Sequence, residues 1–173
     1  KEGNNKSYSV EGGVGLVSSR LTVQGPIVKD QSSFIISGRR TYILDLAQPF
    51  INNTDFAGTN YYFYDFNAKV NHKLGEKDRL YLSGYFGRDI FVFNQEKRDF
   101  RFELPYGNAT ATLRWNHLIT DKLFFNFSAV YNAYDLAFDG GQDDFSFNLF
   151  SGIRDYNAKL DFDFFPNPQH NIK

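Results

Sequence analysis

The sequence predicts an all-β fold, an antiparallel up-and-down transmembrane β-barrel segment, and three observations favour it. Residues 61–74, YYFYDFNAKVNHKL, alternate between apolar and polar side chains with a period of two, which is typical of a β-strand. This run exceeds the ~5–6 residues of an ordinary strand and reaches the ~9–11 needed to cross a bilayer obliquely. The 20 Phe and 11 Tyr among 173 residues favour strands and membrane interfaces.

The two sides of this run differ in chemistry, with His72 as the one exception. An α-helix would mix both kinds of side chain on one face, so the helical alternative fails. An extended strand instead gives one apolar face and one water-compatible face. The apolar side holds Tyr62, Tyr64, Phe66, Ala68, Val70 and Leu74, and the polar side holds Asp65, Asn67, Lys69, Asn71 and Lys73.

The same pattern predicts about eight strands along the chain. Near repeats such as DFNAKVN at 65–71 and DYNAKLD at 155–161 indicate that two of them share one environment. The predicted ranges are Ser7–Val17, Arg20–Val28, Ser32–Leu44, Asn60–Leu74, Arg79–Arg88, Asn108–Ile119, Leu123–Tyr134 and Phe145–Phe165.

Turn signals order these strands into a meander. Short polar turns are expected at Lys29–Asp30, Gly75–Asp78, Thr120–Lys122 and Pro166–Pro168. Longer irregular connections are expected around Asp45–Thr59, Asp89–Tyr106 and Asp135–Asp144. Short turns at one end and long loops at the other are typical of membrane barrels. We expect all five prolines (Pro26, Pro49, Pro105, Pro166 and Pro168) at strand ends, turns or loops, because proline cannot donate a ladder hydrogen bond.

The polar sides of the strands supply the candidate functional residues. We predict that they line a hydrated lumen or face a plug domain. Eight strands alone would close a narrow barrel in which these charges must pair, whereas a wider ring would leave them hydrated. The final residues 171–173 follow a turn signal, so we expect a longer polypeptide and the wider ring. The candidates are Arg39, Asp65, Asn67, Lys69, Arg114, Asp155, Lys159 and Asp161.

A soluble β-sandwich is the main alternative, because its strands also alternate. Sandwich strands are shorter and joined by Greek-key crossovers, and a soluble sheet needs a second layer over its aromatic face. The long strands and the meander therefore favour the membrane. The mean hydropathy of -0.46 does not contradict this, because half-polar strands average to a low value.

Composition excludes several other classes. A net charge of -1 makes nucleic acid a poor partner. The absence of cysteine excludes disulfides and thiolate metal sites. The sequence contains no run of about 18 apolar residues, so it predicts no transmembrane helix.

The chemistry-bearing residues also give no catalytic site. His72, His117 and His170 are scattered, so we expect no metal site, cofactor or enzymatic activity. A barrel-embedded hydrolase stays a third hypothesis, although no serine has a nucleophile-elbow context. We expect close strand packing or plug contact at Gly12–Gly15, and a solvated loop at Asp139, Asp143 and Asp144.

Arg39 and Arg40 are adjacent in a predicted strand, so they must point to opposite faces. Arg39 is the one expected on the polar face. There we expect it to pair with Asp65 or with a plug carboxylate rather than with substrate.

Two stretches carry a family resemblance: GPIVKDQSSFIISGRRTY (Gly25–Tyr42) and NAKVNHKLGEKDRLYLSGYFG (Asn67–Gly87). Nearly the whole chain resembles the start of the barrel in TonB-dependent outer-membrane transporters. It is most similar to the branch with a carboxypeptidase-regulatory-like domain before the plug. The motifs are structural, so they leave the substrate open.

The resemblance implies that residues 1–173 form the N-terminal portion of a barrel of about 22 strands, filled by a plug. The function would be active uptake of a scarce nutrient across the bacterial outer membrane. Implied partners are the lipid bilayer, the protein's own plug and remaining strands, TonB through an upstream segment, and in some members a surface lipoprotein lid. The turns at Asp30, Asp78, Asp121 and Pro168 would be periplasmic. The alternative is a small non-energised barrel acting as a pore, adhesin or structural surface protein.

Overall fold

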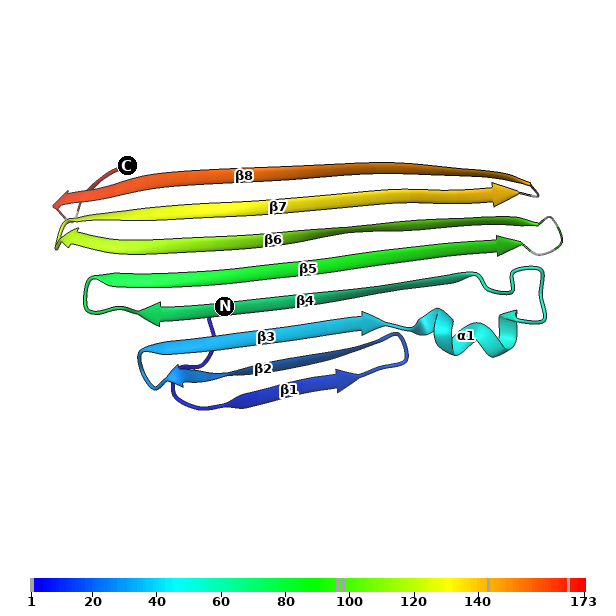
Figure 1. The fold of residues 1–173 in the computed structure, drawn as a ribbon. Helices are drawn as coiled ribbons and strands as arrows, with labels where there is room; N and C mark the ends of the chain where they lie inside the picture. Colours follow the sequence, from blue (N-terminus) through cyan, green and yellow to red (C-terminus); the bar gives the residue numbers. More distant parts are fainter. Residues whose placement is uncertain (1, 96, 98, 143, 168) are drawn as a thin grey trace.

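The computed structural model describes residues 2–95, 97, 99–142, 144–167 and 169–173. Within these ranges the protein is a single antiparallel sheet in which every strand pairs with the next along the chain (Figure 1). The elements are β1 (Ser9–Val14), β2 (Ser18–Val28), β3 (Ser32–Thr41), α1 (Ile43–Ile51), β4 (Asn60–Lys73), β5 (Asp78–Gln95), β6 (Phe100–Thr120), β7 (Leu123–Gln142), β8 (Phe145–Asn167) and β9 (His170–Ile172).

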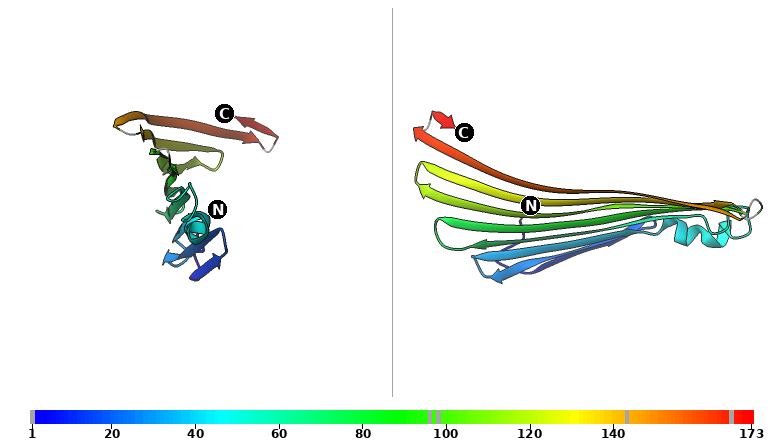
Figure 2. Two further views of the ribbon diagram at one scale, coloured as in Figure 1. Left: turned by 90° about the vertical axis from the view of Figure 1, so that its right-hand side faces the viewer. Right: turned by 45° about the horizontal axis from the view of Figure 1, so that its top comes forward.

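This order confirms the all-β, up-and-down prediction, and the eight predicted strands correspond to β1–β8. The sheet does not close, since β1 and β9 are its two edges. Figure 2 shows it twisted and curved along the strands, with the edges far apart. Apart from Pro26 and Pro105, no apolar side chain among the described residues is buried. The sheet therefore has no hydrophobic core of its own, and each face is available to another environment.

Two of the three expected irregular connections are wrong. Residues 89–95 continue β5, 100–106 begin β6, and 135–142 continue β7, so these strands reach 18, 21 and 20 residues. Phe91 and Phe93 pair across the strands with Leu104 and Phe102, which keeps the period-two alternation going. The predicted acidic loop is also divided: Asp139 lies in β7, Asp144 lies in a turn, and Asp143 falls outside the described residues.

The third connection contains a helix that the sequence analysis missed. Helix α1 follows β3 directly, so the predicted strand ending at Leu44 stops at Thr41. Two hydrogen bonds tie the helix to the start of β4: Asn60 donates to Asp45 at 2.7 Å, and Gln48 donates to the Thr59 carbonyl at 3.0 Å. The helix therefore lies at the edge of the sheet where β3 ends and β4 begins, as Figure 1 shows.

The proline prediction is wrong for Pro105 and Pro49. Pro49 lies inside α1. Pro105 lies inside β6, where it pairs with Ile90 of β5 while the ladder to β7 is interrupted between Glu103 and Tyr106. The missing amide therefore points to the interrupted side. Pro26 lies at a register shift near the end of β2, and Pro166 lies at a register shift near the end of β8. Pro168 falls outside the described residues.

Residues 2–8 cross the sheet instead of beginning the first strand at Ser7. The Asn5 carbonyl accepts a hydrogen bond from Asp30 at 2.9 Å, and Glu2 pairs with Arg79 at 3.4 Å. A β-carbon added at Gly3 would lie 2.1 Å from the Phe34 carbonyl oxygen, so only glycine allows this close approach. Ser32 and Ser33, near this segment in β3, are only 1% exposed.

Candidate functional site: a two-faced sheet

The strand register places all eight candidate residues on one side of the sheet. Arg39 pairs with Asp65, Lys69 pairs with Ser83, and the ladders continue through β8 without exchanging sides. We call this side, with the residues in register with them, the polar face. The candidates on it are Arg39, Asp65, Asn67, Lys69, Arg114, Asp155, Lys159 and Asp161.

Charges on the polar face make local pairs. Arg39 contacts Asp65 through two nitrogens, at 2.8 Å from Nε and 2.7 Å from Nη2, which confirms the Asp65 alternative of the two predicted partners. Arg40 turns to the opposite side, where it lies 3.6 Å from Asp45. Lys69 lies over the ring of Tyr81 at 5.5 Å, a cation–π contact.

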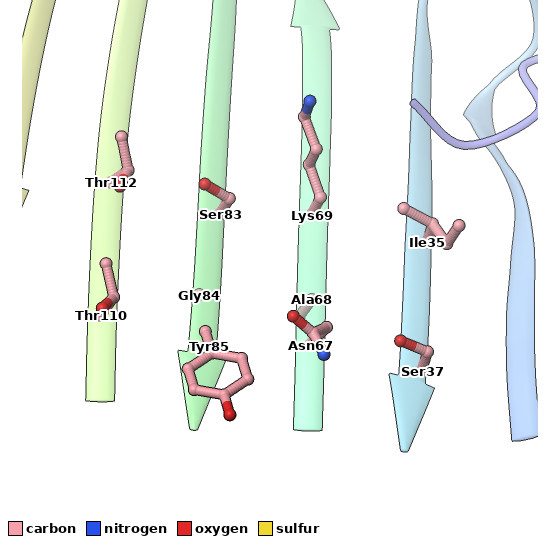
Figure 3. A pocket seen from close by; sticks show the side chains of 10 residues that line it. All are labelled: Ile35, Ser37, Asn67, Ala68, Lys69, Ser83, Gly84, Tyr85, Thr110 and Thr112. Atoms are coloured by element: carbon pink, nitrogen blue, oxygen red, sulfur yellow. The ribbon is translucent and has the colours of Figure 1, made fainter. Parts of the chain in front are cut away.

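The middle of the polar face is lined with hydroxyl and amide groups (Figure 3). A shallow hollow of about 300 Å³ lies across β3–β6, with Asn67 and Lys69 on its wall. These groups supply donors and acceptors without a dominant charge, so the surface suits water. The polar side chains around the hollow include Ser37, Ser83, Tyr85, Thr110 and Thr112.

A second hollow, of about 460 Å³, brings Arg114, Lys159 and Asp161 together on β6–β8. Lys159 pairs with Asp161 at 2.9 Å. Asp155 lies further along β8, where it accepts a hydrogen bond from Asn132 at 3.3 Å. The candidates therefore form a continuous polar strip with no single catalytic cluster among them.

The opposite side carries an exposed apolar band. Leu82 is 56% exposed, Leu160 53% and Tyr156 78%. Contact of so large an apolar surface with water is unfavourable. We define the band as the side chains on this side at Tyr64, Phe66, Ala68 and Val70 of β4, Leu80, Leu82, Gly84 and Phe86 of β5, Ala109, Ala111, Leu113 and Trp115 of β6, Phe125, Phe127, Ala129, Tyr131 and Ala133 of β7, and Tyr156, Ala158, Leu160, Phe162 and Phe164 of β8.

Polar residues delimit this band at both ends. On β5 the limits are Asp78 and Arg88, ten positions apart. At ~3.3 Å per residue they are about 33 Å apart along the strand, and a barrel tilt of ~40° would reduce this to about 25 Å. That height equals the apolar band of outer-membrane barrels. Arg154 and Asp135, joined at 2.8 Å, continue the limit on β8 and β7.

Aromatic side chains mark the end of the band near the short turns. Trp115 donates from Nε1 to Asp78 at 2.8 Å, and His117 Nδ1 lies 2.7 Å from the same carboxylate. Hydrogen bonds from His117 and Trp115 lower the pKa of Asp78, which lies outside the band. The Trp115 ring meets Phe125 edge-on at 5.0 Å. Such a cluster fits a headgroup interface, where aromatic rings anchor barrels.

Beyond Arg88 the chemistry of both sides changes. The side that was polar becomes a row of phenylalanines, the Phe belt: Phe91, Phe93, Phe100, Phe102, Phe138, Phe145 and Phe147. Ring contacts connect β5 to β8, from Phe91–Phe102 at 5.6 Å through Phe102–Phe138 at 5.5 Å to Phe138–Phe147 at 5.1 Å. The opposite side becomes mixed: it carries the charged Arg101, Glu103 and Asp139 together with the apolar Ile90, Val92 and Phe150. The sequence analysis missed the Phe belt, although the alternation of Phe91 and Phe93 with polar or aliphatic residues signalled it.

A polar cluster of Tyr61, Asp89 and Tyr106 separates the candidate residues of the polar face from the Phe belt. Tyr61 donates to Asp89 at 3.0 Å. Burial and the neighbouring Asp89 raise the pKa of Tyr61, which lies beyond the apolar band, to about 12. Burial and Asp89 also raise the pKa of Tyr106. Both phenols therefore stay neutral donors at physiological pH.

Compared with known proteins, the chain matches no family model, no curated protein and no solved structure. In the described ranges, no helix has the length and apolar character needed to cross a membrane. Nor do three His, Cys, Asp or Glu side chains in those ranges converge as metal ligands would.

Proposed function

We propose that this chain is part of the barrel wall of a TonB-dependent outer-membrane receptor that actively imports a scarce nutrient. The observation that carries the proposal is the delimited apolar band backed by a continuous polar face. Lipid would contact the band, and water, plug and substrate would contact the polar face. The sequence resemblance of Gly25–Tyr42 and Asn67–Gly87 supports the specific family.

The open sheet favours a ring wider than these strands. A strand edge within a bilayer leaves amide and carbonyl groups unsatisfied, at a cost of several kcal/mol for each group, so a barrel must close. β8 spans 23 residues, yet β9 pairs with it only from Phe164 to Asn167. Further strands of the polypeptide would complete the ring of about 22 strands known for plugged transporters.

The segment 2–8 supports an occupied interior. It crosses the polar face, where Asn4 donates to Gln24 at 3.2 Å and Glu2 reaches Arg79. A chain entering the wall from a plug would have to cross this same face. The eight candidate residues would then border the hydrated path around the plug.

Cysteine labelling tests the sidedness, because the sequence has no cysteine of its own. In the full-length polypeptide in its native outer membrane, we expect Thr112→Cys to react with a membrane-impermeant maleimide. Its neighbour Ala111→Cys should resist that reagent and, once spin-labelled, report a lipid environment. Equal aqueous labelling at both positions would contradict the membrane assignment.

Energy coupling needs a separate measurement. The full-length polypeptide should bind the periplasmic domain of TonB directly, and substitutions in the upstream TonB-binding segment should abolish that binding. Correct cysteine sidedness without TonB binding would support the non-energised barrel instead.

A further inference from the structure

Asp89 is a carboxylate without a cationic partner among the described residues of the polar face. Arg39, the nearest arginine on that face in register, is already paired with Asp65 at 2.7 Å. Arg88 neighbours Asp89 in sequence but points to the opposite side of β5. The Asp89 carboxylate instead accepts a hydrogen bond from the neutral phenol of Tyr61, at 3.0 Å.

Aromatic rings begin immediately beside this carboxylate. Tyr61 contacts Phe91 with ring centroids 6.5 Å apart, and Phe91 contacts Phe102 at 5.6 Å. Asp89 pairs across the strands with Tyr106. Asp89 thus sits at the margin of the Phe belt, where a negative charge meets a wide apolar surface.

The charge of Asp89 and the chemistry of the rings select one class of occupant. Phenylalanine rings offer no conventional hydrogen bonds, and their faces attract cations. The basic residues at this end of β6 and β8, Arg101 and Arg154, lie on the opposite side of the sheet. Among the described residues at this end of β5–β8, a molecule on this side therefore meets the Asp89 carboxylate, which has no cationic partner there, and a set of apolar rings.

We propose that Asp89, Tyr61, Tyr106 and the Phe belt form a binding site for an organic cation that bears an apolar or aromatic group. The ammonium or guanidinium group binds Asp89, and the apolar part packs on Phe91 and Phe102. The site rests on the proposed function in one respect, since barrel closure turns this surface into an enclosed vestibule. It extends that function by naming a ligand class.

Titration calorimetry on the full-length polypeptide in lipid nanodiscs tests the site, with empty nanodiscs as the blank. Phenethylammonium is the probe, and phenethyl alcohol and ethylammonium each remove one half of the recognition. We expect saturable binding of phenethylammonium, roughly 10-fold or more tighter than either analogue. Equal affinity for the alcohol, or no saturable binding, overturns the proposal.

Substitutions locate the binding. Asp89→Asn and Phe102→Ala should each weaken phenethylammonium binding by roughly 10-fold. Asp139→Asn, on the opposite side of β7, is the matched control and should bind like the unsubstituted protein. Unchanged binding in Asp89→Asn overturns the proposal, and if that variant does not fold, the comparison of amine and alcohol decides alone.

A further arm distinguishes the source of the cation. An acetylated, amidated Phe-Lys-Phe peptide presents the same chemistry on a polypeptide, and tighter binding of it than of phenethylammonium assigns the site to peptides. Failure of all the cations in a protein with correct cysteine sidedness rejects this site alone. Failure of the cysteine sidedness rejects the membrane wall instead.

Discussion

Gly107 of β6 lies close to the backbone of β5. A β-carbon added there would lie 2.4 Å from the Gly87 carbonyl oxygen, whereas one added at Gly84 would lie 3.8 Å from the Thr110 carbonyl. We expect Gly107→Ala to lower the free energy of unfolding by about 1–3 kcal/mol, because the backbone of β5 or β6 would have to move to make room for the methyl group. Gly84→Ala is the control and should change it little. Urea unfolding of the full-length barrel in vesicles measures both, and equal effects would contradict the close approach.

Asp78 makes a pH-sensitive contact at the end of the sheet near the short turns. Its pKa is lowered by His117 and Trp115, so its contribution to stability is present above the ordinary carboxyl pKa of about 3.9 and is lost as pH falls through the lowered value. Trp115 is the single tryptophan of the sequence. In a form whose only tryptophan is Trp115, we expect an emission change below about pH 3.9. Asp78→Asn should abolish it, and a transition that persists would sink the assignment.

At the scale of a strand, β6 carries two environments side by side. Ala111 lies in the middle of the apolar band, and Thr112 lies on the polar face. We expect Ala111→Arg to cost about 2–4 kcal/mol of unfolding free energy, the range for arginine at the bilayer midplane. Thr112→Arg should cost far less because its side remains hydrated. Unfolding in vesicles compares the two, and similar losses would contradict a lipid-facing band.

The alternation of side chains allowed the strands and their sides to be predicted, but only within the apolar band. There an apolar residue marks one side of the sheet throughout, as Ala109–Trp115 and Tyr156–Phe164 show. Beyond Arg88 the alternation of side chains continues, but the side that was polar now carries phenylalanines. Because this broke the expected pattern, Phe91 and Phe102 were assigned to loops. The short helix α1 was missed because Pro49 lies inside it, and proline was interpreted as a loop signal.

The candidate residues were predicted individually, and their grouping needed the register. Arg39 and Asp65 are far apart in sequence, and their pairing was one of two alternatives. The hollow that joins Arg114 to Lys159 and Asp161 depends on β6, β7 and β8 together. Asp89 was missed because it lay in a segment assigned to a loop.

At the scale of the whole molecule, the long free edge of β8 decides what the isolated chain would do. Residues 145–163 of β8 have no described partner on the side away from β7. We expect residues 1–173 expressed alone to associate through this edge, since unpaired strand edges recruit other strands. Size-exclusion chromatography in detergent should show oligomers or aggregates. A monodisperse monomer with full strand content would contradict this expectation.

Each long strand keeps one uninterrupted alternation of sides, although the side that is polar before Arg88 carries the Phe belt beyond it. Because successive side chains point to opposite sides, one extra residue early in β5 would shift that alternation for everything after it. In the proposed barrel, side chains of the polar face would then point toward lipid, and Phe91 and Phe93 would no longer point into the vestibule. Length is therefore the most tightly constrained property of these strands, ahead of the identity of almost any side chain on them.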